Sequence, residues 1–501
     1  MSQIANTIMG IDLGTQSIKV IIYCPDNLEV ITSASSPFDL ISKEDGSREQ
    51  IASWWIDGFK ECLSNIDDDV KKSVVAIGVS GQQHGFVPVD KDGNVLVPVK
   101  LWCDTATEQE CHEIMEAVGG EKACVVIAGN SISVGYTASK ILWLKKNNPD
   151  AYARMTGILL PHDYLNFYLT GKQTMECGDA SGTGLLDVRK RVWSKEIILA
   201  LDSERDLSSC LPELIGADDI SGIIKGDIAE ALGLRTDVVI SAGGGDNMMA
   251  AIGTGNIEPG KLTASLGTSG TLFAYSDQAA IDPNGKLAAF CSSTGGWLPL
   301  LCTMNCTVAT EQMRELLNVD LKQLEKLVAT ITPGSDGVIT VPFYNGERTP
   351  ALPKAKASIF GLDGHNTTNA HLIRSAMEAA IFNLKAGLDA FVRCGMTFDE
   401  VTLTGGGSKS AVWRQICADI LNLPVKTLMT EENAAFGAVL QAYWALNKHN
   451  GSETTLKEIV VHHLREDKNK SCAPNADAVK QYEKIYAQYQ SFVKLITPHY
   501  S

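Results

Sequence analysis

An aspartate preceded by three glycines is the side chain of this sequence best suited by its setting to accept a proton. Asp246 follows Gly243, Gly244 and Gly245, and Asn247 comes next. When an alcohol attacks a γ-phosphoryl group, an aspartate within hydrogen-bond reach of the hydroxyl removes its proton, and a neighbouring amide can orient another hydroxyl. Asp246 could instead be the N-cap of the helix expected directly after it, a role that aspartate often fills. Both roles are compatible only if the carboxylate also faces a cleft.

A short turn near the N-terminus could bind phosphate groups. It contains Asp12, Gly14 and Thr15, and Lys19 follows it. A glycine-containing hairpin turn points backbone N–H groups at phosphate oxygens, and a threonine adds a hydroxyl. A carboxylate at the end of the strand can hold Mg²⁺ directly or through a water molecule. Because the same residue types form ordinary β-turns, this turn alone leaves both interpretations open.

Residues 266–270 repeat the first turn, with Gly267 and Thr268 following a leucine as Gly14 and Thr15 do. Two such turns facing each other across a cleft could hold the β- and γ-phosphates of a nucleotide. The pair is therefore more specific for phosphate binding than either turn alone.

A third glycine-rich turn lies between a strand expected over residues 401–405 and a helix expected over 410–421. It contains Gly405, Gly406 and Gly407, followed by Lys409. Glycines let the chain approach a ligand closely, and a helix N-terminus offers free N–H groups to an adenosine or its phosphate. Three glycines can also serve steric needs alone, but beside two other such turns we favour nucleotide binding.

Candidates for holding a polyol follow a strand expected over residues 74–80. Gln83 and His84 lie there between glycines, and Trp102 and Asp104 could add an apolar wall and a further acceptor. Recognition of a sugar needs several directional donors and acceptors, which these side chains and Asn247 supply. The alternatives are an ordinary loop histidine and a core tryptophan.

The elements that must position these residues indicate an α/β protein built from two similar halves. Residues 7–35 show a strand, a glycine turn, a second strand and a third strand, and residues 261–281 repeat the start of this order. Strand-like runs alternate with helix-like ones, for example at residues 53–66 and 137–148. A pattern that is repeated after about half the chain length indicates duplicated domains, because the repeats of a solenoid are much shorter. We place the boundary after Asn247, which gives domains 1–247 and 248–501.

Composition excludes several classes of protein. A chain of 501 residues exceeds one ordinary domain, and its net charge of −16 argues against nucleic-acid and anionic-membrane partners. It contains neither a run of about 18 apolar residues nor a secretory leader pattern, and its thirteen cysteines form no disulfide framework, so we expect a cytoplasmic protein. A complete Walker A loop is missing, because Leu262 follows Lys261 where a serine or threonine is needed.

These features together resemble the FGGY carbohydrate kinases. Two long stretches match the diagnostic patterns of that family, residues 135–144 (GYTASKILWL) and 357–378. Shorter stretches, among them 80–85 (SGQQHG), 159–171 and 343–350 (FYNGERTP), are similar to the members of that family that act on D-xylulose. The resemblance spans nearly the whole chain. It implies two duplicated actin-like, ribonuclease-H-like domains with a catalytic cleft between them.

The resemblance also implies roles for individual residues. Asp246 would be the general base, Asp12 would assist at the phosphate and Mg²⁺ end, and His84 and Asn247 would contact the sugar. The residues that bind the nucleotide would be Thr268, Gly405, Gly406 and Gly407.

The sequence as a whole predicts an ATP- and Mg²⁺-dependent kinase of a ketopentose, with D-xylulose favoured by resemblance. Ribulose, L-xylulose, fuculose and glycerol are the alternative substrates within the class. Outside it, the alternatives are an actin-like or chaperone-like ATPase and a catalytically silent sugar-binding relative. A homodimer is left open as the oligomeric state.

Overall fold

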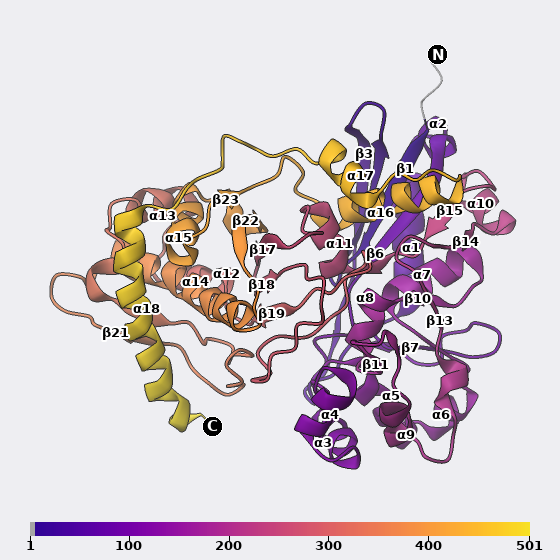
Figure 1. The fold of residues 1–501 in the computed structure, drawn as a ribbon, viewed down its shortest axis with the longest axis horizontal. Helices are drawn as coiled ribbons and strands as arrows, with labels where there is room; N and C mark the ends of the chain where they lie inside the picture. Colours follow the sequence, from indigo (N-terminus) through magenta and orange to yellow (C-terminus); the bar gives the residue numbers. More distant parts are fainter. Residues whose placement is uncertain (1–5, 501) are drawn as a thin grey trace.

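Two lobes, each built around one mixed β-sheet, make up the computed structural model, which describes residues 6–500 (Figure 1). The first sheet has the strand order β14-β15-β6-β1-β2-β3, with β16 paired to β6. Its strands are β1 (Thr7–Leu13), β2 (Ser17–Cys24), β3 (Glu29–Pro37), β6 (Val74–Gly81), β14 (Ile220–Ile223), β15 (Val239–Ser241) and β16 (Gly244–Gly245). Strands β1, β2 and β3 are antiparallel neighbours, whereas β6 is parallel to β1 and β15 is parallel to β6.

The second sheet repeats this arrangement in the order β19-β18-β17-β22-β23. Its strands are β17 (Gly260–Leu266), β18 (Gly270–Phe273), β19 (Leu300–Thr303), β22 (Phe398–Thr404) and β23 (Val425–Lys426). Here too three antiparallel strands precede two that are joined in parallel. The common strand order and directions confirm the prediction of a duplicated α/β fold.

Shorter strands form small sheets around these two. They are β4 (Ile41–Ser42), β5 (Arg48–Gln50), β7 (Val87–Val89), β8 (Val99–Lys100), β9 (Gly157–Leu159), β10 (Thr174–Glu176), β11 (Leu186–Asp187), β12 (Val192–Trp193), β13 (Glu213–Ile215), β20 (Ile339–Val341) and β21 (Ser358–Phe360).

The helices of the first half of the chain pack on and beside the first sheet. They are α1 (Ala52–Ser64), α2 (Asp68–Ser73), α3 (Glu108–Ala117), α4 (Glu121–Ala128), α5 (Thr137–Asn147), α6 (Pro149–Arg154), α7 (Pro161–Thr170), α8 (Cys177–Ala180), α9 (Lys195–Leu201) and α10 (Gly226–Leu232). The helices expected over residues 53–66 and 137–148 are confirmed as α1 and α5.

The later helices divide between the two lobes. They are α11 (Asp246–Gly253), α12 (Thr307–Leu316), α13 (Leu321–Val328), α14 (Asn369–Arg393), α15 (Ala411–Leu421), α16 (Asn433–His449), α17 (Leu456–His463) and α18 (Ala476–Ile496). Figure 1 shows α16 and α17, both yellow-orange, over the indigo strands of the first lobe, whereas α18 lies at the far edge of the second. The boundary after Asn247 stays a prediction. It would assign α16 to the second domain, although this helix packs on the sheet of the first.

The first sheet is covered on both faces, which is why β1 reads as a nearly continuous apolar run. Met9 and Ile11 face one core with Trp55 and Phe59 of α1. Ile8 belongs to the core on the opposite face, which includes residues of α16. The strand ends are thereby fixed from both sides.

Glycines allow α16 to lie directly on the sheet and on α11. A Cβ atom added at Gly10 would lie 2.2 Å from the Ala435 carbonyl oxygen. One added at Gly78 would lie 2.0 Å from the Ala438 carbonyl oxygen. At the crossing of the two helices, a Cβ at Gly437 would lie 1.8 Å from the Met249 carbonyl oxygen. Since α11 begins at Asp246, this contact helps to set the position of the candidate base.

Substituting Gly437 by alanine is therefore expected to destabilise the protein, by about 1–3 kcal/mol as for other overpacked sites. The new methyl group meets backbone rather than a flexible side chain, so the two helices must separate. Thermal or urea unfolding measures the effect. Gly226→Ala is the matched control, because a Cβ atom added at this helical glycine would have no neighbour within 4 Å. Equal stability of the two variants would contradict the assigned helix crossing.

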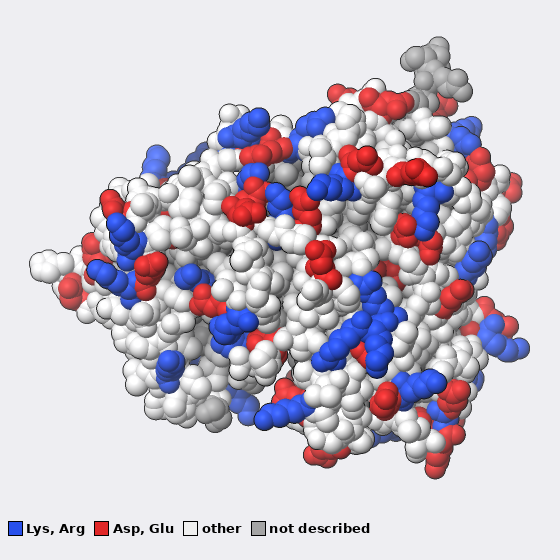
Figure 2. Space-filling view, in the orientation of Figure 1, with Lys and Arg blue, Asp and Glu red and all other residues white. Residues whose placement is uncertain are grey.

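Among residues 6–500, no helix is both long and apolar enough to cross a membrane. The thirteen cysteines are free thiols in this part of the chain. The expectation that the chain lacks a secretory leader rests partly on residues 1–5, which lie outside the described residues. Acidic and basic side chains are intermingled over the face drawn in Figure 2.

Candidate active site

The carboxyl ends of β1, β6 and β16 meet at one edge of the first sheet and bring Asp12 and Asp246 together. Asp12 on β1 and Gly244 on β16 both pair with Ser80 on β6, from opposite sides. The Ser80 hydroxyl donates a hydrogen bond to Asp12 Oδ1 (2.8 Å). Asp246 follows Gly245 as the first residue of α11. The two predicted carboxylates thus lie on neighbouring segments, as parallel strand ends require.

Both carboxylates bind their protons more tightly than usual. The pKa of Asp246 is raised to about 7, mainly by burial and then by the charge of Asp12, against the hydrogen bonds that Asn247 donates. Burial raises the pKa of Asp12 to about 6, although the Ser80 hydroxyl opposes this shift. A carboxylate with a pKa near neutrality combines availability at physiological pH with the basicity that proton removal needs.

The first glycine turn is held by its own strands and by the loop after β6. The Gly14 amide donates to the Ser17 carbonyl (3.0 Å). The Thr15 hydroxyl donates to Gln82 Oε1 (3.1 Å) and accepts from Trp102 Nε1 (2.9 Å). Thr15 was expected to offer its hydroxyl to a phosphate, but in this structure the hydroxyl ties the turn to the neighbouring loop.

The second and third glycine turns lie against each other. A Cβ atom at Gly405, whose φ is +79°, would lie 2.8 Å from the carbonyl oxygen of Leu266, and one at Gly407 would lie 2.8 Å from the Leu266 Cβ. The carbonyls of Gly267 and Thr268 accept hydrogen bonds from the start of α12. Only glycine permits this approach, so the structure brings together two of the three turns that the sequence singled out.

The two predicted phosphate-binding lysines pair with adjacent glutamates. Lys19 Nζ lies 2.6 Å from Glu432 Oε1, and Lys409 Nζ lies 2.9 Å from Glu431 Oε2. The side chains of both pairs are partly exposed, so the contribution of the pairs to stability is small. They connect the first and third turns to the residues that precede α16.

His84 is held in an unusual backbone conformation at the edge of the first sheet. Its φ of +66° is rare for a residue with a side chain. The Lys140 ammonium donates to the His84 carbonyl (2.7 Å), and so does the Thr137 hydroxyl (3.1 Å). Lys140 is fully buried, so these contacts fix the histidine from within the protein.

The His84 ring is neutral and has one free acceptor nitrogen. Burial, and then the charge of Lys140, lowers its pKa to about 3. Its Nδ1 lies 2.6 Å from the Gly182 carbonyl oxygen, which can only accept, so Nδ1 carries the hydrogen. Nε2 is therefore an acceptor, suited to a sugar hydroxyl.

Two aromatic residues that the sequence did not single out pack around this ring. The ring centroids of Tyr136 and Phe290 lie 4.8 and 5.8 Å from that of His84. Tyr136 and Lys140 fall within the 135–144 pattern, which could have drawn attention to them, whereas nothing in the sequence marks Phe290.

Gln83 and Asn247 form a polar link between the loop after β6 and α11. Asn247 Nδ2 donates to Gln83 Oε1 (3.1 Å) and to Asp246 Oδ1 (3.0 Å), and its backbone amide also donates to Asp246 Oδ1 (2.8 Å). The predicted sugar contacts and the predicted base thus belong to one hydrogen-bonded group.

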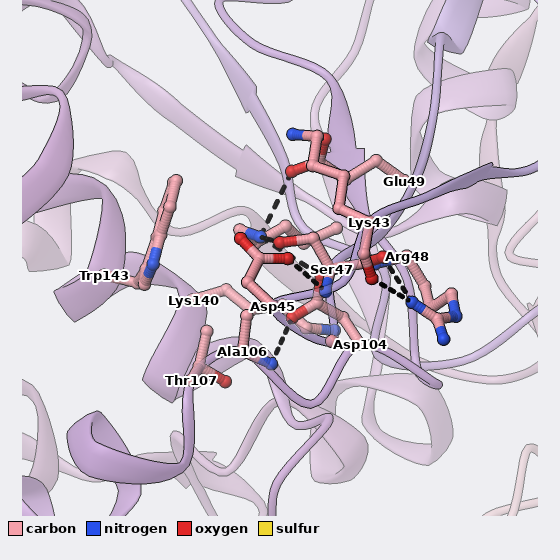
Figure 3. A network of polar contacts seen from close by, with 12 residues as sticks. Lys43, Asp45, Ser47, Arg48, Glu49, Asp104, Ala106, Thr107, Lys140 and Trp143 are labelled. Atoms are coloured by element: carbon pink, nitrogen blue, oxygen red, sulfur yellow. Dashed lines mark hydrogen bonds and ion pairs between the residues drawn. The ribbon is translucent and has the colours of Figure 1, made fainter.

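Asp104 differs from its expected position. Its side chain is fully buried, and its oxygens accept from the Arg48 and Ala106 backbone amides (2.8 and 3.1 Å) and from Lys100 Nζ (3.1 Å). Figure 3 shows Asp104 in this network, close to Arg48 and Ala106. With its lone pairs used inside the protein, Asp104 supports the loop that carries Trp102 rather than a ligand, and we do not include it among the sugar contacts.

The second lobe approaches the same edge. Cys302 on β19 pairs with Thr271 of the strand that follows the second glycine turn. Burial raises the pKa of the Cys302 thiol, and the charges that act on it include Arg348 and Asp246. Met248 and Ala251 of α11 pack in one hydrophobic cluster with Phe273 on β18 and Leu300 on β19, so the helix that begins with Asp246 contacts the second sheet.

Comparison with known proteins shows the family of this chain. Residues 7–253 match the model of the N-terminal domain of the FGGY family of carbohydrate kinases, and residues 262–446 match the model of its C-terminal domain. The chain belongs to the FGGY family of carbohydrate kinases. A xylulose kinase of Haemophilus influenzae is 44% identical over 488 residues, which cover 96% of this FGGY kinase and 98% of that protein.

Solved structures have the same fold. A crystal structure of xylulose kinase from Bifidobacterium adolescentis matches this FGGY kinase with a TM-score of 0.81 at 28% identity, over 96% of this chain and 99% of that one. Plasmodium falciparum glycerol kinase with ADP matches with a TM-score of 0.88 over 98% of each chain, but at 21% identity this shows the fold alone.

The residues of this FGGY kinase fit ATP and a magnesium ion. The family uses ATP, and the second and third turns offer closely packed glycine backbone of the kind that surrounds phosphate groups. Asp12 provides a carboxylate at the end of β1, fixed by the Ser80 hydroxyl, and such hard oxygens are the ligands that Mg²⁺ takes. No group of three or more potential metal ligands exists among residues 6–500.

Proposed function

We propose that this carbohydrate kinase transfers the γ-phosphoryl group of ATP to D-xylulose and forms D-xylulose 5-phosphate. The proposal rests on the identity of 44% with a xylulose kinase over almost the whole chain. It is supported by one hydrogen-bonded group that combines a base with polar contacts for a sugar, Asp246, Asn247 and Gln83. The expectations of a homodimer and of a cytoplasmic location stay predictions.

In this proposal Asp246 removes the proton of the terminal hydroxyl as its oxygen attacks the γ-phosphorus. His84 Nε2 accepts a hydrogen bond from another hydroxyl of the ketose, and Asn247 orients a third. A pKa of about 7 keeps a substantial fraction of Asp246 ionised at neutral pH. Most of the acceleration comes from this positioning and from stabilisation of charge.

The nucleotide lies in this proposal on the glycine turns, with Gly14 on one side and Gly267, Gly405, Gly406 and Gly407 on the other. Asp12 would hold Mg²⁺, and the ion would neutralise part of the phosphate charge when it is bound. The Ser80 hydroxyl fixes Asp12 Oδ1 for this role. Thr15 and Lys19 keep the first turn in place through Trp102 and Glu432.

A panel of sugars tests the substrate. We expect kcat/KM for D-xylulose to exceed the values for D-ribulose, L-xylulose, L-fuculose and glycerol by about 100-fold or more, because a site that pairs hydroxyls leaves buried groups unpaired with the wrong isomer. Coupled detection of ADP measures the rates, with ATP hydrolysis in the absence of sugar as the blank. A higher kcat/KM for another sugar would replace the substrate, and hydrolysis indifferent to all sugars would favour an actin-like ATPase.

A further inference from the structure

Lys140, in the first turn of α5, is a buried amine that the proposed reaction does not use. Its side chain has no exposed surface, and a lysine is almost never fully buried unless its charge is paired. Its Nζ nevertheless has only two hydrogen-bond partners among residues 6–500, and both are backbone carbonyl oxygens, of His84 (2.7 Å) and of Gly135 (2.6 Å). This lysine therefore binds two backbone segments rather than a carboxylate.

A second buried lysine near α5 shows the usual arrangement. Lys100 Nζ lies 3.1 Å from Glu49 Oε1 and 3.1 Å from Asp104 Oδ2, so its charge is balanced. It also lies 4.2 Å from the centroid of the Trp143 ring on α5. Burial lowers the pKa of Lys140 to about 7, but a neutral amine still has two N–H groups, enough for the two carbonyls. The two hydrogen bonds of Lys140 are thus available with or without its charge.

The Gly135 end of this contact is fixed by close packing. Gly135 has a φ of +97°, and a Cβ atom added there would lie 2.3 Å from the Trp102 carbonyl oxygen. Trp102 is itself held at its indole ring, whose Nε1 donates to the Thr15 hydroxyl (2.9 Å). The turn at Gly135 therefore gives Lys140 a firm support on the loop that carries Trp102.

The His84 end of the contact is a strained backbone. A residue with a side chain stays at a φ such as +66° only where its surroundings hold it there. The His84 carbonyl is held by two donors, Lys140 Nζ and the Thr137 hydroxyl (3.1 Å). The ring is held separately, by the hydrogen bond of Nδ1 to the Gly182 carbonyl. Without the two donors the carbonyl could turn, and the position of the ring would change with it.

We propose that Lys140 is a positioning residue for the sugar, which clamps the His84 carbonyl to the Gly135 turn and so keeps Nε2 of His84 directed at the ketose. This inference rests on the proposed contact between His84 and the sugar. Lys140 lies behind His84 and touches neither the sugar nor ATP. Its loss should therefore weaken the binding of the sugar and leave the nucleotide turns unaltered.

Lys140→Met tests the proposal in the full-length enzyme, because methionine has a similar length but no N–H group. We expect the KM for D-xylulose to rise about 10-fold or more, the effect of leaving buried acceptors without their donor. The KM for ATP should change less than about 2-fold, and kcat should change little, since binding rather than chemistry is altered. Steady-state rates with each substrate varied in turn measure these values.

Lys146→Met is the matched control, since it removes a lysine from the same helix. Lys146 Nζ pairs with Glu110 and Glu113 (3.1 and 2.7 Å), and its side chain is 38% exposed. None of these residues contacts His84 or the Gly135 turn. Both KM values of this variant should therefore equal those of the unchanged enzyme.

A double-mutant cycle shows whether Lys140 acts through His84. Glycine adopts a positive φ without strain and has no ring, so His84→Gly alone should raise the KM for the sugar. Adding Lys140→Met should then raise this KM by less than about 2-fold more, because the side chain that Lys140 positions is already absent. A lysine with a merely structural role would lower the melting temperature, and its effect on KM would multiply with that of His84→Gly.

Thr137→Val keeps the test open if Lys140→Met does not fold. Valine has the shape of threonine but lacks the hydroxyl that donates to the same His84 carbonyl. One donor remains in this variant, so the KM for the sugar should rise by a smaller factor, about 3-fold. The KM for ATP should again stay unchanged.

An unchanged KM for the sugar in folded Lys140→Met would overturn the proposal, and so would full multiplication of the two factors in the double variant. If Lys140→Met does not fold, an unchanged KM in Thr137→Val overturns it. Failure of the proposed function looks different. A wrong substrate appears as a preference of the unchanged enzyme for another sugar, with which the same variants are then compared. A KM that is unmoved in His84→Gly would remove the sugar contact itself, and this inference with it.

Discussion

Replacing Asp246 by asparagine is expected to lower kcat about 10²- to 10⁴-fold, the usual contribution of general-base catalysis. Asparagine has nearly the same shape and can still accept the hydrogen bonds from Asn247, but it cannot take up the proton of the attacking hydroxyl. Steady-state assays with saturating sugar and ATP measure the change. Binding of ATP, measured by calorimetry, should persist, because the glycine turns are unaltered.

The melting temperature of Asp246→Asn, compared with that of the unchanged enzyme, shows whether the variant is correctly folded. The pKa of Asp246 is raised above that of an unfolded aspartate, so the folded protein loses stability as pH rises through about 7. The asparagine side chain has no charge to desolvate and no repulsion with Asp12. The variant should therefore melt at a higher temperature than the unchanged enzyme above the pKa of Asp246, with the gain disappearing near the ordinary carboxyl pKa.

The control is Asp187→Asn, which removes a different buried carboxylate and should keep kcat within a small factor. Turnover by Asp246→Asn close to that of this control would remove Asp246 from the mechanism. A lower melting temperature together with low activity would point to misfolding, and would contradict the electrostatic account of the site.

Local patterns explain why so much of the site could be predicted from the sequence. The glycine turns after Asp12 and Leu266 are recognisable because alternating apolar residues on both sides predict strands, and the structure confirms the two hairpins. Parallel pairing of β1 with β6 then places Asp12 beside Ser80, and the strand that ends in glycines places Asp246 next to them. Each step needs only residues close in sequence and the pairing of neighbouring strands.

Contacts between distant segments could not be predicted in this way. Asp104 follows a tryptophan in a polar stretch and has the composition of a ligand-binding residue, yet its partners Arg48 and Lys100 come from two different strands. The buried His162 contacts Asp179, 17 residues away, and Phe290 reaches His84 from a segment 206 positions later in the chain, between β18 and β19. Burial and pairing of this kind depend on the complete fold.

One of the two long family patterns holds a residue whose role is structural. Glu378 lies in α14 and is almost fully buried. Its Oε1 accepts from Arg374 Nε (2.7 Å), the Tyr482 hydroxyl (2.7 Å) and the Gly334 amide (2.9 Å), and its Oε2 accepts from the Ser335 hydroxyl (3.0 Å). This carboxylate joins α14 to α18 and to the turn before β20, away from the candidate base.

Glu378→Ala is expected to lower the free energy of unfolding by about 3–5 kcal/mol, the range found when one partner of a buried ion pair is removed. The loss leaves the Arg374 guanidinium buried without its carboxylate and removes the acceptor of three other donors. Urea unfolding followed by fluorescence measures it. Below the melting temperature, kcat per folded molecule should stay unchanged, because none of these contacts includes Asp246 or the residues bonded to it.

Glu311→Ala provides a matched comparison, since Glu311 and Arg314 form an ion pair within α12 but with side chains 40% and 25% exposed. An exposed pair contributes about 1 kcal/mol or less.

Replacing both buried partners, in Arg374→Met with Glu378→Leu, should recover part of the lost stability, because no buried charge then lacks a partner. If Glu378→Ala were no more destabilising than Glu311→Ala, the buried ion pair would not be the interaction that stabilises the packing of α18 on the second lobe. If the double variant were the least stable of all, the carboxylate would act through Gly334 and Ser335 rather than through Arg374.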